Sequence, residues 1–418
     1  MVGFETDERG RYGRIGRIET PSGPVTTPAF FPVLNFISGT TTDSGGVWRY
    51  ARTRLLADDR FEGALFQAMN FLDYDSVTPE QLADWTAKPM CEHYPEFTEP
   101  LFVDSGGFKL MNTRTFGEPP EAGGETNEWG VYTDPESILN LQIAYGADVV
   151  ATLDFPIPPD LNDAERDERL SRSIDSAIEC LSLVAERDAD PAVYVAVHGH
   201  DYETINWYVS RVLDRAAGVD ADFHGFAVGS LVPFRNNHDT LVDIIQGARD
   251  AIPAARRDDL GLHVFGVGGR LLPLLALLGV DSFDSSTYIQ AAKFKKFLRP
   301  TTWRKVEADD VDFETWDCTC PTCSDLDFDR LQRVLYADAS YRKIDGAYKS
   351  EFYAAIAAHN FQLFRDEVDR TRAAIADDRL LEYTATVARE IDDVGRALER
   401  AQVRDTDLRE ALAEAGHD

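Results

Sequence analysis

The segment Asp148-Val-Val-Ala-Thr-Leu-Asp154 is followed by a helix-like stretch over residues 163–187 and then by Val193-Tyr-Val-Ala-Val-His198. Both short runs are largely apolar, as expected of strands that are covered on both faces of a parallel sheet. The stretch between them is long enough to be the crossover helix that parallel neighbours require. These residues therefore predict a strand–helix–strand unit.

The same alternation recurs along the first 290 residues. It predicts eight strands, at residues 30–36, 64–71, 101–104, 148–154, 193–198, 226–229, 263–267 and 281–285. Helix-like segments follow most of them, at residues 135–145, 163–187, 202–215, 239–251 and 270–278. Eight such units favour a (β/α)8 TIM barrel of the α/β class, with an open doubly wound sheet as the alternative.

Polar residues at the strand ends favour the barrel. Asp104, Asp154, His198, Gly229-Ser230 and Asp284 each lie at or just after the last apolar residue of a predicted strand. The carboxyl ends of all barrel strands meet at one rim, where the active sites of this fold form. We therefore expect these residues to share one site.

The composition is strongly acidic, with 73 Asp and Glu against 42 Lys and Arg in 418 residues and a net charge of −31. The basic residues are mostly Arg, which is typical of a halophile's surface; a mesophilic protein that avoids nucleic acid is the alternative. One basic strip interrupts this pattern. It contains Lys293, Lys295, Lys296, Arg299, Arg304 and Lys305, without an acidic residue between them. In strong salt, which screens long-range repulsion, such a strip is expected to bind phosphates rather than to be a solvated face.

The sequence predicts neither a membrane partner nor a secretory signal. No stretch reaches the ~18 apolar residues of a membrane span, since the longest candidate, residues 271–280, is interrupted by Pro273. The chain is charged from Glu5 onward, unlike a signal peptide. A cytoplasmic, reducing location follows as an expectation.

Three of the five cysteines lie close together in Cys318-Thr-Cys320-Pro-Thr-Cys323, and His359 follows within a helix-like segment. In a reducing compartment this spacing indicates metal rather than disulfides. Three thiolates and one imidazole form a closed tetrahedral set, which predicts one structural Zn²⁺ and no open position for water. A packing role for His359 is the alternative.

Two aspartates are the residues best suited to acid/base and nucleophilic catalysis. Asp104 lies in Phe102-Val-Asp104-Ser-Gly-Gly-Phe108, and Asp284 lies in Gly279-Val-Asp281-Ser-Phe-Asp284. Two facing carboxylates are the usual equipment for breaking a glycosidic bond with retention. By themselves they equally suit a metal site or a sugar hydrolase.

The segmentation predicted from these patterns has three parts. Residues 1–300 form the barrel, residues 301–376 form an inserted zinc-binding subdomain with closing helices, and residues 377–418 form a helical extension. Helices are expected over residues 350–376 and 380–413. A Gly- and Pro-rich lid is expected at residues 113–134.

The ordered set of motifs resembles the tRNA-guanine transglycosylase family over roughly residues 10–365. The matching strings are Asp104-Ser-Gly-Gly-Phe108, Leu153-Asp154-Phe-Pro156, Phe226-Ala-Val-Gly229, Gly279-Val-Asp281-Ser-Phe-Asp284 and the cysteine motif with its later His359-Asn360. Details such as His263-Val-Phe-Gly-Val-Gly-Gly269 look closer to the archaeal, archaeosine-pathway branch.

The resemblance implies a retaining exchange of guanine for a 7-deazaguanine base, 7-cyano-7-deazaguanine by expectation, in tRNA. Asp284 matches the nucleophile, Asp104 the acid/base, and Asp154 the residue that reads the base. Gly229 and Ser230 match donors to the base carbonyl. Because the target nucleotide must leave its stack, apolar walls are expected around the base, with Phe108 as one candidate.

Three departures from the family pattern leave the incoming base and the polymer open. Lys109 stands where many members have Gln, His198-Gly199-His200 stands where Gln-Gly-Gly is common, and Ser230 replaces a glycine. His198 is retained as a candidate base contact because imidazole can donate to a carbonyl. Only about 60 residues follow His359, where archaeal members carry further RNA-binding domains.

Several alternatives therefore stay open. The same exchange on DNA, as in the DNA-directed 7-deazaguanine branch, is the nearest one. A non-catalytic, zinc-stabilised nucleic-acid-binding subunit and a barrel glycosidase acting on small substrates are the others. A homodimer or an accessory subunit is expected if the chain needs help to bind nucleic acid.

Overall fold

A computed structural model describes residues 2–37, 46–72, 79–111, 125–126, 132–187, 190–219, 222–312, 314–338 and 342–414. The lid expected at residues 113–134 lies outside the described residues, apart from 125–126 and 132–134.

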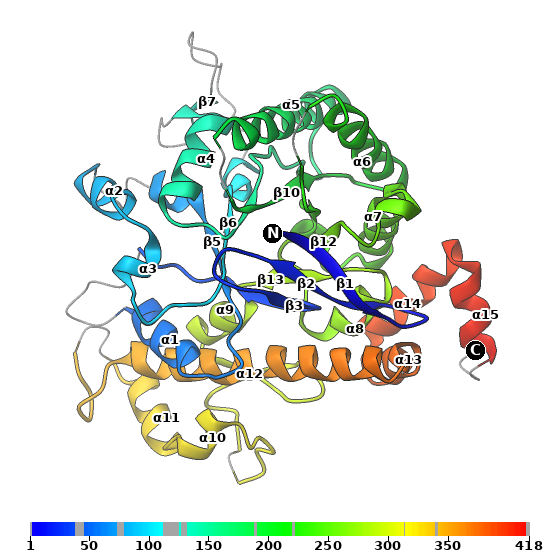
Figure 1. Ribbon diagram of the computed structural model, residues 1–418. Helices are drawn as coiled ribbons and strands as arrows, with labels where there is room; N and C mark the ends of the chain where they lie inside the picture. Colours follow the sequence, from blue (N-terminus) through cyan, green and yellow to red (C-terminus); the bar gives the residue numbers. More distant parts are fainter. Residues whose placement is uncertain are drawn as a thin grey trace.

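Eight parallel strands form a closed barrel (Figure 1). They are β4 (Ala29–Pro32), β5 (Ala64–Gln67), β6 (Leu101–Asp104), β9 (Val149–Ala151), β10 (Ala192–Val197), β11 (Gly225–Val228), β12 (Gly261–Val264) and β13 (Ser282–Ser285). Their order is β4-β13-β12-β11-β10-β9-β6-β5. The barrel closes where Leu34 N donates to Leu65 O at 2.9 Å. All eight predicted strands and the predicted (β/α)8 fold are confirmed, but the strand predicted at residues 64–71 ends at Gln67, and Ala68–Leu72 form a 3-10 helix.

Helices surround the barrel (Figure 1). They are α1 (Val47–Leu56), α2 (Pro79–Thr86), α3 (Met90–His93), α4 (Pro135–Ala144), α5 (Asp163–Arg187), α6 (Tyr202–Ala216), α7 (His238–Ala251), α8 (Leu272–Leu277) and α9 (Thr287–Lys293). Several begin at side-chain caps that satisfy free backbone amides. Asp134 accepts from Ser137 N at 2.7 Å, and Asp201 accepts from Thr204 N at 2.8 Å. The predictions of α4 to α8 are confirmed, whereas α1 to α3 and α9 were not predicted.

A small antiparallel sheet covers the amino-terminal end of the barrel (Figure 1). It consists of β1 (Gly3–Arg9), β2 (Arg14–Glu19) and β3 (Val25–Thr27). Phe4 and Ile18 join the barrel-interior cluster that contains Phe102. The amino-terminal end is therefore plugged by side chains.

Beyond the barrel strands, the chain forms a hairpin and a helical subdomain. These elements are β14 (Lys296–Leu298), β15 (Lys305–Glu307), α10 (Pro321–Asp325), α11 (Phe328–Tyr336) and α12 (Lys349–Ala376). Helix α12 runs along the barrel against α1, α9 and β4 (Figure 1). Phe364 of α12 stacks on Phe30 of β4, with ring centroids 4.6 Å apart. Thus α12 takes the position of the eighth barrel helix.

The prediction of one helix over residues 380–413 is wrong, because the segment forms three helices. They are α13 (Leu380–Glu390), α14 (Asp392–Arg404) and α15 (Thr406–Glu414). Ile391 and Asp405 adopt extended backbone between them. Acidic residues directly after both breaks favour new helix starts. The remaining described strands, β7 (Glu125–Thr126) and β8 (Tyr132–Thr133), pair with each other. No helix in the described ranges is both long and apolar enough to cross a membrane.

Candidate active site

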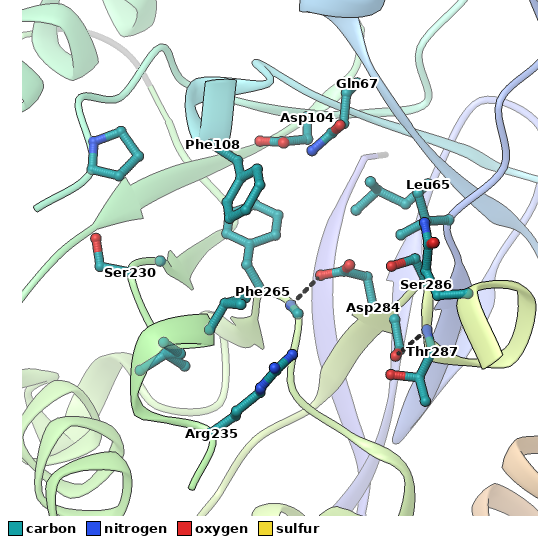
Figure 2. Close-up of a pocket in the computed structure, with 18 of the residues that line it drawn as sticks. Leu65, Gln67, Asp104, Phe108, Ser230, Arg235, Phe265, Asp284, Ser286 and Thr287 are labelled. Atoms are coloured by element: carbon teal, nitrogen blue, oxygen red, sulfur yellow. Dashed lines mark hydrogen bonds between the residues drawn. The ribbon is translucent and has the colours of Figure 1, made fainter. Parts of the chain in front are cut away.

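A cavity of about 400 Å³ opens at the carboxyl ends of the barrel strands (Figure 2). Six of the seven predicted catalytic and base-binding residues line it: Asp104, Phe108, Asp154, Gly229, Ser230 and Asp284. They come from the ends of β6, β9, β11 and β13 or the turns that follow. The barrel therefore brings together residues up to 180 positions apart in the sequence.

Asp104 is the last residue of β6, and it is buried at the edge of the cavity. Burial, followed by the negative charges of Asp154 and Asp284, raises the pKa of Asp104 well above 3.8. Hydrogen bonds from Gly106 N, at 3.2 Å, and from the Gln67 side chain only partly oppose this shift. The site thus favours a neutral, proton-carrying Asp104.

Asp284 projects into the same cavity from β13 (Figure 2). Its Oδ1 atom accepts from Gly266 N at 2.8 Å and lies 3.5 Å from His263 Nε2. Burial lowers the pKa of His263 despite this carboxylate, so the imidazole is neutral near pH 7. Its Nδ1 atom bonds Ser282 Oγ at 2.9 Å. The Oδ1 atom is therefore held by a rigid amide, while Oδ2 has no hydrogen-bond donor among the described residues.

Asp154 is buried on the side of the cavity next to Asp104. Ser105 Oγ donates to its Oδ1 atom at 2.5 Å, and His198 Nε2 lies 3.1 Å from Oδ2. A Cβ atom on Gly107 would lie 2.2 Å from Oδ1, so only glycine at this position allows the carboxylate to sit there. The second glycine of the Asp-Ser-Gly-Gly turn thus makes room for Asp154.

His198 is completely buried, and it is absent from the residues that line the cavity. Its Nδ1 atom lies 3.0 Å from Ser230 Oγ, which also accepts from Ile157 N at 2.9 Å. A Cβ atom on Gly229 would approach the imidazole to 2.5 Å. The structure therefore places His198 behind Asp154 and Ser230 rather than at the cavity wall.

The turn after β11 offers one amide fewer than its sequence suggests. Gly229 N donates to Val197 O at 2.9 Å, so it is used within the barrel sheet. In contrast, Ser230 N has no acceptor in the described part of the chain. Ser230 has a left-handed backbone (φ 60°), in the region usually occupied by glycine. Of these two amides, that of Ser230 is therefore the one left to donate to a ligand carbonyl group.

Two aromatic rings border the cavity. Phe108 is 54% exposed and Phe265 follows β12; both rings lie on the same side of the cavity (Figure 2). Phe265, Gln67 and Arg235 were not singled out from the sequence. Phe265 was predictable, because it falls within the strand predicted at residues 263–267, but Arg235 follows a short turn with no motif to mark it.

The basic strip is divided between α9 and the β14–β15 hairpin. Lys293 Nζ lies 4.6 Å from the ring centroid of Trp48, which lines the cavity. Lys295 and Arg299 lie over the rings of Tyr336 and Trp316. The other three basic residues of the strip are Lys296, which pairs with Glu307 at 3.0 Å, and the exposed Arg304 and Lys305. The contact between Lys293 and Trp48 connects the start of the strip to the cavity.

The predicted metal ligands converge on one point. The ligand atoms of Cys318, Cys320, Cys323 and His359 all lie within 4.8 Å of one another. The three Sγ atoms are 3.5, 3.5 and 3.2 Å from His359 Nδ1. With metal bonds of about 2.3 Å to sulfur and 2.0 Å to nitrogen, a tetrahedral zinc ion needs S···N edges of about 3.5 Å. His359 Nε2 lies 2.8 Å from Leu298 O, which fixes Nδ1 as the ligand atom. The residues fit a metal ion.

Fold and site together define a (β/α)8-barrel protein with three buried aspartates in its cavity and a Cys3His cluster that could hold a metal ion. The family model described as queuine tRNA-ribosyltransferase matches residues 79–393, and the chain belongs to this family. The predicted family is therefore confirmed.

Relatives named tRNA-guanine(15) transglycosylase are similar to most of the chain. The protein of Thermococcus kodakarensis is 25% identical over 380 residues, which cover 90% of this chain and 55% of the relative. That of Methanopyrus kandleri is 26% identical, covering 93% and 72%. That of Haloferax volcanii is 27% identical, covering 92% and 64%. The chain thus spans about half the length of the Thermococcus relative.

Proposed function

We propose that this protein exchanges guanine for a 7-deazaguanine base in tRNA through a covalent glycosyl-enzyme intermediate. One observation carries the proposal: a buried Asp104 with a raised pKa shares a cavity with Asp284, whose Oδ1 atom is held by Gly266 N. A proton donor and a fixed carboxylate at one cavity are the two groups that a retaining exchange needs.

In the first half-reaction, Oδ2 of Asp284 attacks C1′ of the target guanosine, and the bond from C1′ to the base breaks. Asp104 gives its proton to the departing guanine and becomes a carboxylate. In the second half-reaction, Asp104 takes the N9 proton of the incoming base. The freed nitrogen attacks C1′ and releases Asp284, which restores both aspartates to their starting states.

Asp154 and Ser230 are the proposed base-reading groups. The Asp154 carboxylate accepts from the ring N–H and the exocyclic amine, and the Ser230 amide donates to the base carbonyl. Phe108 and Phe265 supply apolar walls for an extruded base. His198 acts through Asp154, since it is buried behind that carboxylate.

The Cys3His cluster is proposed to hold one structural Zn²⁺. Because the protein fills all four positions, the ion would join the cysteine segment to α12 rather than activate water. In this scheme, residues 1–300 carry the chemistry, residues 301–376 brace the barrel, and residues 377–418 extend it. Work on tRNA would place the protein in the cytoplasm.

One experiment identifies both the polymer and the incoming base, and so separates the archaeosine-type exchange with 7-cyano-7-deazaguanine from the DNA alternative. The protein is first incubated with labelled guanine and either a tRNA transcript or duplex DNA. Unlabelled 7-cyano-7-deazaguanine is then added to each reaction. We expect label to enter tRNA, to be displaced by the deazaguanine, and to stay out of DNA.

Denaturing electrophoresis tests the intermediate. A protein–tRNA adduct should form with the unaltered chain and with Asp160→Asn, an exposed aspartate that does not line the cavity. The adduct should be lost in Asp284→Ala. Polymer binding without exchange or adduct would contradict the proposal and support a non-catalytic binding subunit. Turnover of small glycosides without a polymer would support a glycosidase.

A further inference from the structure

Phe294 is the most exposed of the large apolar side chains that the structure describes, at 70%. Single exposed apolar residues are common on protein surfaces, so exposure alone carries no argument. Trp207 of α6 and Val403 of α14 are also exposed, at 51% and 62%, but neither lines the cavity or belongs to the basic strip. Phe294 differs from both of them in its position.

Helix α9 leads from the cavity to Phe294. The helix begins at Thr287, which lines the cavity together with Gln290 (Figure 2). The helical turn continues to Phe294, whose N–H donates to Ala291 O at 3.0 Å. Phe294 follows Thr287 by seven positions and Gln290 by four, so all three share one helix face. Helical side chains also lean toward the N-terminus, which is the cavity end of α9. Phe294 thus extends the cavity side of α9 by about 6 Å.

Two lysines flank Phe294 in the sequence, and each is held by an aromatic ring. Lys293 Nζ lies 4.6 Å from the ring centroid of the cavity residue Trp48, and Lys295 Nζ lies 4.0 Å from that of Tyr336. A ring leaves the ammonium charge intact, whereas a carboxylate would neutralise it. An exposed aromatic ring between two cations is the combination that binds unpaired nucleotides, because the ring stacks on a base and the cations attract the phosphates.

We propose that Phe294 stacks on the base of a nucleotide next to the extruded one, while Lys293 and Lys295 attract the adjoining phosphates. This proposal rests on the proposed function and extends it, because it names a contact outside the base-reading pocket. Extrusion of the target nucleotide breaks its stacking with both neighbours, so each neighbouring base loses a partner on one face. Phe294 lies one helical turn beyond the cavity, a position that suits a neighbour rather than the target itself.

The test is a binding cycle between the ring and the RNA. A fluorescent tRNA transcript is compared with a series of transcripts that each carry one abasic nucleotide at a successive position. All proteins carry Asp284→Ala, so that no covalent adduct contributes to Kd. On the complete transcript, Phe294→Leu should weaken Kd about tenfold, as for the loss of one stacked base, and Phe294→Tyr should keep Kd because it retains the ring. The salt slope of log Kd should not change, since no charge is removed.

At one abasic position the difference between Phe294 and Leu should vanish, and this position should adjoin the guanosine that is exchanged. Trp207→Leu is the matched control, because it removes an exposed ring that does not line the cavity; it should bind like its parent.

Normal binding by Phe294→Leu, or a loss that persists at every abasic position, would overturn the stacking contact. A shift from dimer to monomer in light scattering of Phe294→Leu would also overturn it, because the ring would then join two copies of the chain. Binding needs no chemistry, and the abasic series covers all positions, so this contact and base exchange can fail separately.

Discussion

The Nε2 atom of His198, which is buried and does not line the cavity, lies 3.1 Å from Oδ2 of the cavity residue Asp154. Through its other nitrogen the same imidazole reaches Ser230 Oγ at 3.0 Å. One buried side chain thus contacts both of the residues that we propose to read the base.

Replacement of His198 should therefore act on base binding. In His198→Gln the shorter amide cannot reach both partners, so Asp154 loses the imidazole that lies 3.1 Å from its Oδ2 atom. We expect KM for guanine to rise about tenfold, as for the loss of one polar contact, with a smaller change in kcat. Steady-state exchange kinetics check this, with the partly exposed neighbour His200→Gln as control. A fall in kcat alone would contradict it.

Asp104→Asn should stabilise the fold while abolishing exchange. Burial and then the neighbouring carboxylates raise the pKa of Asp104 above 3.8. A carboxyl group with a raised pKa stabilises the folded state below its unfolded value, and this contribution is lost as pH rises through the folded value. The free energy of unfolding of the variant should therefore be higher than that of the unaltered chain at neutral pH. Urea unfolding over a pH series should show the gain shrinking toward pH 3.8; a gain independent of pH would refute this explanation.

Metal loss should destabilise the attachment of α12 to the cysteine segment. In Cys320→Ser the tetrahedral donor set is incomplete, so we expect less than one zinc per chain by elemental analysis. The free energy of unfolding should fall by roughly 5 kcal/mol, because structural zinc contributes directly to folding. Cys91→Ser, which changes an exposed cysteine outside the cluster, should keep both zinc and stability. Full stability of the metal-free protein would argue against a structural ion.

The buried Arg14–Asp281 pair should matter for stability alone. Arg14 Nε and Nη2 donate to the two carboxylate oxygens at 2.7 and 2.6 Å, at the end of the barrel opposite the cavity. Arg14→Leu leaves a buried charge without its partner and should cost about 3–5 kcal/mol. Arg9→Leu, which breaks the exposed pair with Asp258, should cost less than about 1 kcal/mol. Guanidinium unfolding measures both; equal costs would contradict the difference in burial.

High salt should stabilise this protein. Its net charge of −31 produces electrostatic repulsion within the folded protein. Salt screens this repulsion, and the screening length becomes shorter as the salt concentration rises. Calorimetry over a series of KCl concentrations should therefore show a rising Tm. A Tm that is independent of KCl would remove the support for a halophile's surface.

The barrel strands were predictable because each is a short, largely apolar run, and five of them end at or next to a polar residue. The rim was predictable for the same reason, and Asp104, Asp154 and Asp284 do share one cavity. The direction in which a side chain points at the rim was not predictable. His198 follows β10 at the rim, but whether it faces the cavity or the layer behind depends on side-chain alternation, which a shift of one residue reverses.

Other features depend on contacts that no local pattern records. The β1–β3 sheet is rich in charged residues, and only its packing on the barrel end buries Phe4 and Ile18. The breaks at Ile391 and Asp405 were not predictable, because apolar residues continue at helical spacing across them.

The stacking of Phe364 on Phe30 constrains how the chain is made. During synthesis β4 leaves the ribosome early, and α12 follows only after more than 300 further residues. The face of β4 that α12 covers in the folded protein is therefore exposed for most of synthesis. During that interval its apolar surface is open to mispairing, and a nascent-chain chaperone would be most needed then.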